Sequence, residues 1–166
     1  MALRPSPLTV TSPDPHADLS RPLLPGRDEL AAFLRAEFPQ TRCTVREAGP
    51  GRAVVVHPVG EAELRPGGTV SGPVLMTTAD VALYVAILAT IGIVPLAVTT
   101  HLSINFLRKP AAGRDVVGVC TLLKTGRSLV IGEVALYSDG GSEPVAHAVG
   151  TYAVPPGAER RDTPRG

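Results

Sequence analysis

One stretch limits what this chain can fold into: eighteen consecutive residues, Val81 to Val98, contain no charged side chain. A loop rich in glycine and proline, Arg65 to Pro73, comes shortly before this run, and Asp80 stands at its edge. A segment this long and apolar has to be removed from water, either in the core of the protein or in a membrane.

The signals at both ends of this stretch predict a helix. Pro73 suits the first turn of a helix, where its missing N–H costs nothing and its fixed φ is already helical. Residues 92–95 contain a glycine and a proline, which are helix stop signals. We therefore expect a helix over residues 73–91, about five turns long, with Ser71 or Gly72 as its N-cap.

The predicted helix is apolar almost all the way round, so it has to be buried on most sides. A transmembrane helix is the alternative, but a glycine, a proline and the nearby Asp80 count against it, and strand-like sequence follows at once. A soluble core helix wrapped by a sheet is the better account.

Asp80 needs an explanation in such a helix, because burying an unpaired carboxylate costs several kcal/mol. The residues one turn away offer no basic partner: they are Met76, Thr77, Leu83 and Tyr84. Either Asp80 faces solvent or is satisfied by Thr77 and Tyr84, or it is an active-site carboxylate at the mouth of a pocket.

Length and charge narrow the class of protein. The 166 residues suffice for one domain with a core, and the formal net charge of +1 gives no electrostatic sign of a nucleic-acid or charged-membrane partner. Cys43 and Cys120 match no metal or redox spacing and are expected to be small buried thiols. No signal peptide precedes the domain, so we expect a cytoplasmic location.

Proline-rich and charged segments flank the part of the chain that can fold. Residues 1–26 contain six prolines and cannot build a core, and residues 155–166 are charged and proline-containing. We therefore expect two disordered tails around a domain over residues 27–154. That domain should open with a short helix, Arg27 to Phe38.

The other periodic segments predict strands. Residues 61–64 are a candidate extension of the second strand. The predicted strands are 41–47, 52–57, 97–107, 116–124, 128–137 and 143–154. The turns at 125–127 and 138–142 are short, so the last three strands should form an antiparallel meander. The sequence therefore predicts an α+β fold, a curved antiparallel sheet around one long central helix.

Some polar residues near strand ends are candidates for binding. The strand 97–107 alternates, with His101, Ser103 and Asn105 on one face and Thr100, Leu102, Ile104 and Phe106 on the other. Arg108, Lys109 and Arg127 are basic groups at strand ends that could meet phosphates. His57 stands at the end of the second predicted strand.

Four segments together resemble the hotdog-fold acyl-CoA thioesterases, and the phenylacetate-pathway (PaaI-like) branch in particular. The resemblance covers about residues 40–154, and its motifs are Gly67–Pro73, Leu75–Asp80, Ser103–Pro110 and Ala146–Tyr152. It implies a hotdog domain that forms homodimers, commonly paired into tetramers. It also implies hydrolysis of acyl-CoA thioesters with no metal and no cofactor other than the coenzyme A of the substrate, and no nucleic-acid or membrane partner.

The resemblance also implies site residues. Members of this branch carry His-Gly-Gly before the helix and an acidic residue eight positions after the first glycine, a spacing that Gly72 and Asp80 keep. Ser71 and Pro73 replace the histidine and the second glycine. Arg65 stands where an Asn or Gln is often found. Arg65 and Ser71, at these two positions, are candidate substrate-binding residues. Asn105, on the polar face of the strand 97–107, is a third candidate.

The chemistry agrees with these roles. The amide of Gly72 at a helix N-terminus can stabilise the oxyanion that forms on the thioester carbonyl. Asp80, within reach of that amide, would act as a general base on water or as a nucleophile. Arg108, Lys109 and Arg127 are the candidates for the phosphates of coenzyme A.

Two other functions stay open at this stage. The chain could bind acyl-CoA without catalysis, because Ser71 and Arg65 depart from the family pattern. It could also be a hotdog hydratase or dehydratase, which needs a histidine beside an acid in the pocket, so His57 or His101 would have to supply it.

Overall fold

The apolar run folds as the core helix of the protein. In the computed structural model, which describes residues 24–156, α2 spans Gly72–Ile91 and Gly92 follows as its C-cap. Thirteen of the 20 residues of α2 are buried, which explains why apolar side chains occur on all its sides. By length and composition α2 could also cross a membrane, but 72% of its most apolar window is buried inside the protein.

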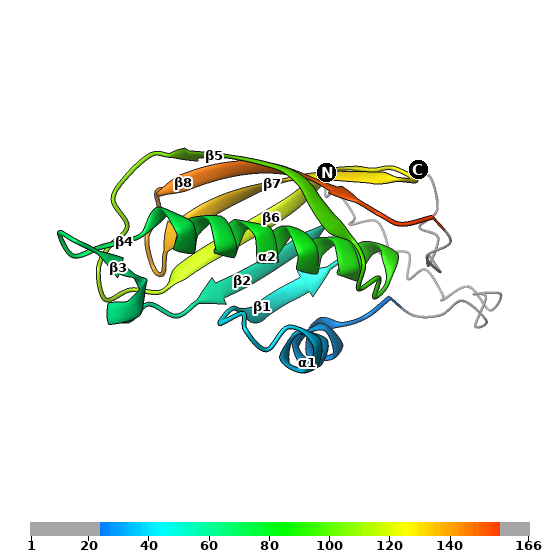
Figure 1. The fold of residues 1–166 in the computed structure, drawn as a ribbon, viewed down its shortest axis with the longest axis horizontal. Helices are drawn as coiled ribbons and strands as arrows, with labels where there is room; N and C mark the ends of the chain where they lie inside the picture. The colour runs from blue at the N-terminus through cyan, green and yellow to red at the C-terminus, as the bar shows by residue number, and fades with distance from the viewer. Residues whose placement is uncertain (1–23, 157–166) are drawn as a thin grey trace, which may run out of the picture.

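The remaining elements form a curved sheet around α2 and a helix beside it (Figure 1). They are α1 (Arg27–Glu37), β1 (Thr44–Gly49), β2 (Arg52–His57), the 3-10 turn η1 (Glu61–Glu63), β3 (Leu64–Arg65), β4 (Thr69–Val70), β5 (Val98–Phe106), β6 (Val116–Thr125), β7 (Leu129–Ser138) and β8 (Ala146–Ala153). All of them fall within the span expected for the domain. The predicted tails lie almost wholly outside the described residues.

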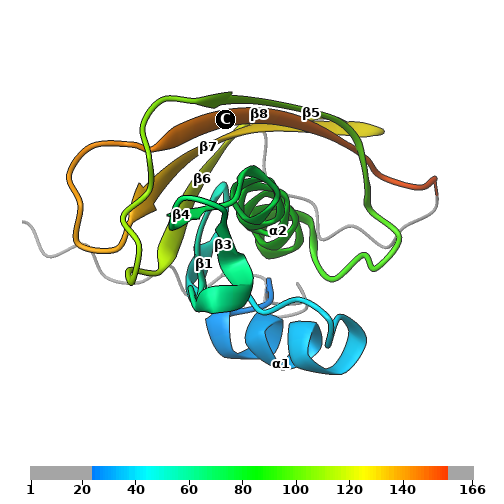
Figure 2. The same ribbon diagram turned by 60° about the vertical axis from the view of Figure 1, so that its left-hand side comes forward.

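The main sheet has six strands in the order β1-β2-β6-β7-β8-β5, and every neighbouring pair is antiparallel. It arches over α2, and α1 packs below against β1 and α2 (Figure 2). The predicted meander of the last three strands is confirmed. Strand β5 returns to the far edge beside β8, so β1 and β5 are the two edge strands of this sheet.

The sheet comes closest to α2 at a pair of glycines. Gly132 of β7 pairs with Gly150 of β8, and both face Leu83 of α2. A Cβ atom at Gly132 would lie 2.7 Å from Leu83 Cδ2, and one at Gly150 would lie 2.5 Å from Leu83 Cδ1. The two glycines thus form a recess that holds the Leu83 side chain.

The sequence prediction was wrong for two local features. Residues 61–64 do not extend β2, because Glu63 turns inward and the chain forms η1 followed by the short β3–β4 hairpin. This hairpin turns at Gly67 and Gly68, whose φ values of 96° and 72° favour glycine. A bulge between Thr99 and His101 also shifts β5, so that Thr99 takes the helix-facing position that alternation gave to Thr100.

Candidate active site

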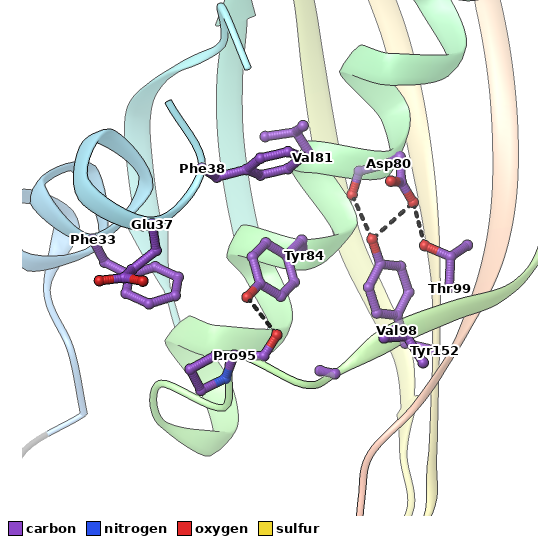
Figure 3. Close-up of a pocket in the computed structure, with 11 residues that line it drawn as sticks. Phe33, Glu37, Phe38, Asp80, Val81, Tyr84, Pro95, Val98, Thr99 and Tyr152 are labelled. Atoms are coloured by element: carbon purple, nitrogen blue, oxygen red, sulfur yellow. Dashed lines mark hydrogen bonds between the residues drawn. The ribbon is translucent and has the colours of Figure 1, made fainter. Parts of the chain in front are cut away.

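The carboxylate of Asp80 is held by side chains from two neighbouring strands of the sheet, β5 and β8, which lie far apart in the sequence. Its Oδ1 accepts a hydrogen bond of 2.6 Å from the Thr99 hydroxyl and one of 2.7 Å from the Tyr152 hydroxyl (Figure 3). Thr99 and Tyr152 are paired across β5 and β8, which brings both hydroxyls to the same point on α2. Thr77 and Tyr84, the partners that helix spacing suggested, do not bind it. Tyr84 donates instead to the carbonyl of Pro95.

This arrangement leaves one oxygen of Asp80 available. Both hydroxyl donors bind Oδ1, whereas Oδ2 accepts no hydrogen bond within residues 24–156. Burial, and then the nearby Asp80 charge, raise the pKa of Tyr152 far above its usual range, so its hydroxyl stays protonated and donates. Asp80 is thus oriented and half-buried, and its Oδ2 is free of hydrogen bonds from the described residues.

A pocket of about 490 Å³ opens beside Asp80. Aromatic rings form much of its wall: Phe33 lies 6.4 Å from Tyr84 between ring centroids, and Tyr84 stacks on Tyr152 at 6.2 Å. Its lining residues are Phe33, Glu37, Phe38, Asp80, Val81, Tyr84, Pro95, Ala97, Val98, Thr99 and Tyr152 (Figure 3). Four of the six Phe and Tyr residues of the chain therefore gather around this carboxylate.

Gly72 lines a second pocket of about 450 Å³. As the first residue of α2, Gly72 has an amide that no earlier carbonyl of the helix can satisfy. A Cβ atom at this position would lie 3.3 Å from the ring of Phe106, so a side chain would crowd the pocket. Arg65, Arg108 and Lys109 also line it, and the structure thus brings three of the predicted phosphate- and substrate-binding residues beside Gly72.

The other predicted binding residues lie outside both pockets. The amide of Ser71 donates to the carbonyl of Glu63, and its side chain makes no capping hydrogen bond. Asn105 pairs with His147 and so occupies the sheet face turned away from α2. Arg127 lies in the turn between β6 and β7.

Within one chain, the structure does not bring Gly72 and Asp80 together. The two residues are eight positions apart on one helix, which separates them by about 12 Å along its axis. They line different pockets. The expectation that Asp80 lies within reach of the Gly72 amide is therefore not met by a single copy of the chain.

Comparisons with known proteins give the family. The Thioesterase superfamily model matches residues 67–145. The crystal structure of a Silicibacter protein described as a "putative thioesterase" is similar to this chain. The two are 42% identical, the match covers 83% of this chain and 97% of the Silicibacter chain, and the TM-score is 0.75. This chain belongs to the thioesterase superfamily.

More distant structures agree with this membership. A mutant of the phenylacetic acid degradation protein PaaI from Thermus thermophilus is 26% identical, covering 75% of this chain and 99% of its own, with a TM-score of 0.61. The fold of zebra fish thioesterase superfamily member 2 is similar as well (21% identity, 78% and 99% coverage, TM-score 0.69). No curated protein matches. The enzyme is a PaaI-like hotdog thioesterase that hydrolyses thioesters.

Neither candidate histidine of this thioesterase lines the Asp80 pocket. His57 is buried, with Nδ1 3.4 Å from Cys43 Sγ and Nε2 4.0 Å from Glu63 Oε1. His101 is exposed on the sheet face away from α2, next to Thr151 of β8.

The two cysteines of the thioesterase are buried, as expected. Burial raises the pKa of the Cys43 thiol to about 11 and that of Cys120 to about 12, so both are poor nucleophiles at neutral pH. In the described part of the chain, no three His, Cys, Asp or Glu side chains are arranged to hold a metal ion. The metal-independent reaction stays a prediction.

Proposed function

We propose that this thioesterase hydrolyses acyl-CoA, with Asp80 as its catalytic carboxylate. The observation that carries the proposal is the oriented carboxylate of Asp80, which Thr99 and Tyr152 hold through one oxygen at the wall of a pocket lined by aromatic rings. A carboxylate held in this way can take a proton from water or attack a carbonyl carbon itself.

The reaction needs only groups that this chain carries. In the general-base route, Oδ2 of Asp80 takes a proton from a water molecule whose oxygen attacks the thioester carbonyl carbon. The carbonyl oxygen becomes negative and is stabilised by the amide of a Gly72 residue at the positive end of α2. When the carbon–sulfur bond breaks, the acyl group is released as a carboxylic acid, and the thiolate of coenzyme A takes the proton from Asp80, which restores the carboxylate.

Since Gly72 and Asp80 of one chain line separate pockets, we propose that the active site forms between two copies. The exposure of the edge strand β5 supports an interface between two copies. Most of its residues are exposed, including the large apolar Val98 and Phe106. A long open edge with apolar side chains is a template for pairing with another strand. Antiparallel pairing of β5 with its own copy would give a symmetric dimer.

The contacts of β5 predict what this pairing would bring together. Thr99, near one end of β5, binds Asp80, and Phe106, at the other end, lies against Gly72. If two β5 strands pair around Ser103, Phe106 of one copy lies opposite Thr100 of the other, in the bulge next to Thr99. Asp80 of one copy would then face the partner's Gly72.

In this arrangement, we expect the phosphates of coenzyme A and the acyl group to bind in different pockets. Arg65 and Lys109, with Arg108 beside them, give the Gly72 pocket the positive charge that the phosphates of coenzyme A require. Arg108 also binds Glu143 and the carbonyl of Pro144, so Arg65 and Lys109 are the freer contacts. The acyl group would occupy the Asp80 pocket, whose aromatic wall favours acyl groups that contain a ring.

The role of Asp80 is tested by the variant Asp80→Asn, assayed by thiol release from short, long and aryl acyl-CoAs. We expect the rate to fall by at least about 10³-fold with the fold retained, because the amide is neither a base nor a nucleophile. Asp28→Asn makes the same substitution at an exposed residue of α1 that lines neither pocket, and it should keep its activity. Full activity in Asp80→Asn would refute the proposal.

The shared site is tested by complementation between Asp80→Asn and Gly72→Val. Each variant alone should be inactive. Unfolding and refolding the two together should restore about a quarter of the wild-type rate, since half of randomly mixed dimers are mixed and each has one intact site. If the two groups acted within one chain, mixing would restore nothing.

The other two functions lack a comparable observation. Within one copy of the chain, neither His57 nor His101 lines the Asp80 pocket, so no histidine–acid pair of the kind a hydratase needs forms there. A binder without catalysis would bind acyl-CoA in calorimetry yet release no thiol, and the assay above separates it from the enzyme.

A further inference from the structure

Glu63 is a buried carboxylate outside both pockets. Only 4% of its surface is exposed, and it belongs to η1, between β2 and the β3–β4 hairpin. Its side chain binds the guanidinium of Arg42 through Oε1 and accepts a 2.7 Å hydrogen bond from the Gly60 amide through Oε2. The Gly60 hydrogen bond, followed by the Arg42 charge, lowers the pKa of Glu63, so it stays ionised at neutral pH.

The backbone of Glu63 reaches the start of α2. Its carbonyl accepts a 2.9 Å hydrogen bond from the Ser71 amide, one residue before Gly72. The residues between them form the β3–β4 hairpin, which has only two paired positions, Leu64 with Val70 and Arg65 with Thr69. So short a hairpin is weak by itself. The Ser71 hydrogen bond therefore ties the start of α2 to the backbone of Glu63.

The Gly60 hydrogen bond caps the start of η1, but it uses only one oxygen of Glu63, and the other oxygen binds Arg42. A buried charge costs free energy unless it is paired, and an apolar residue would fill the same space more cheaply. Glu63 joins three separate segments: the chain leading into β1 through Arg42, the connection after β2 through Gly60, and the N-terminus of α2 through Ser71.

We propose that Glu63 is a positioning residue for the oxyanion amide: the Arg42–Glu63 pair fixes η1 and thereby the place of the Gly72 N–H. This inference rests on the proposed role of Gly72. Glu63 touches no reacting atom, and its effect passes through the backbone from Ser71 to Gly72. A displacement of about 1 Å at a catalytic group can lower the rate by about 10²-fold.

The test compares Glu63→Gln with Glu61→Gln, which makes the same change at an exposed residue of the same turn. We expect kcat to fall by about 10- to 100-fold in Glu63→Gln with KM changed less than about threefold, because an oxyanion donor acts mainly in the transition state. Glu61→Gln should match the wild type. Equal loss in both variants, or no loss in kcat for Glu63→Gln, would overturn the inference.

A double-mutant cycle separates positioning from general destabilisation. Gly72→Ala changes the oxyanion site directly, because its Cβ would lie 3.3 Å from the ring of Phe106. If Glu63 acts through Gly72, Glu63→Gln should add less than about threefold to the loss in the Gly72→Ala background. Full additivity would contradict the proposal. If Glu63→Gln fails to fold, Arg42→Gln removes the same ion pair from a half-exposed side chain.

Hydrogen exchange gives a readout that does not depend on activity. In Glu63→Gln, the Ser71 amide should exchange at least about tenfold faster than in the wild type, while amides in the middle of α2 stay unchanged. If Asp80→Asn kept full activity, the proposed function would fall, yet this exchange measurement would still decide whether Glu63 holds the hairpin. Unchanged exchange at Ser71 would refute the positioning role.

Discussion

At the scale of single residues, the chemistry depends on how a carboxylate is kept on a helix that is otherwise apolar. Asp80 meets no charged partner within 4 Å among the described residues; two neutral hydroxyls stabilise it instead. Thr99 is exposed and Tyr152 is 3% exposed, so one donor comes from the rim of the pocket and one from its floor. Neutral donors orient the carboxylate without neutralising its charge.

Tyr152→Phe tests this orientation. The variant should fold, lose about 1 kcal/mol of stability with the hydrogen bond, and show a kcat about tenfold lower, because only Thr99 would still fix Asp80. Steady-state kinetics and urea unfolding measure the two effects. Tyr137→Phe makes the same change on the face of β7 turned away from α2 and should leave kcat unchanged.

His57 predicts a pH dependence of stability. Burial lowers the pKa of His57 below its usual value, and the Arg42 charge adds to this although Glu63 opposes it. The unfolded chain therefore binds a proton near pH 6.5 that the folded chain does not, so stability is full above about pH 6.5 and falls as the pH decreases below it. Urea unfolding at about pH 7.5 and 5.5 should show this loss, and His57→Gln should reduce it. An identical pH dependence in His57→Gln would contradict this reading.

At the scale of elements, α2 and the sheet fit together through the recess that Gly132 and Gly150 form for Leu83. A central helix under a curved sheet needs such a site, because ordinary side chains on both surfaces would keep the layers apart. Leu83 is fully buried, so a Cβ atom added at either glycine would press on a side chain that is packed in the core.

Gly150→Ala should therefore destabilise the protein by about 1–3 kcal/mol through overpacking against Leu83. The matched control is Gly49→Ala in β1, where a new Cβ would meet nothing within 4 Å. Urea unfolding compares the two variants with the wild type. A Gly150→Ala variant as stable as Gly49→Ala would show that the sheet can shift to make room.

At the scale of the whole molecule, the two edges of the sheet differ. Helix α1 packs against edge strand β1, whereas no helix among the described residues packs over the outer edge of β5, which exposes most of its length. We therefore expect the enzyme to assemble through β5, and we expect the active site to require that assembly, since Gly72 and Asp80 of one chain line separate pockets.

Ser103→Lys tests assembly and activity together. If Ser103 lies near the two-fold axis, two lysines of like charge would face each other across it and oppose pairing. Light scattering should then show a shift from dimer toward monomer, and kcat should fall in parallel. Thr44→Lys makes a comparable change on β1, the other edge strand, and should leave the dimer and kcat unchanged. A dimeric and active Ser103→Lys variant would place the interface elsewhere.

Much of the fold could be read from the sequence because its signals are local. Proline at the start of α2, glycine at its end and the short turns between the last strands act within a few residues. The bulge at Thr99 and the inward turn of Glu63 could not be predicted, because each depends on a partner far along the chain: Tyr152 pairs with Thr99, and Arg42 binds Glu63.

The sequence by itself determined the class of fold, the family, and the two positions, Gly72 and Asp80, on which the proposed chemistry rests. The spacing of eight residues on one helix determined how far apart these two positions lie, and the apolar composition determined that the helix is buried in the core. Only the tertiary structure decided that Thr99 and Tyr152 hold the carboxylate, that the aromatic side chains gather beside it, and that the two positions line different pockets. The reason is that hydrogen bonds and pockets form between elements, and the way the strands curve around α2 sets which side chains meet.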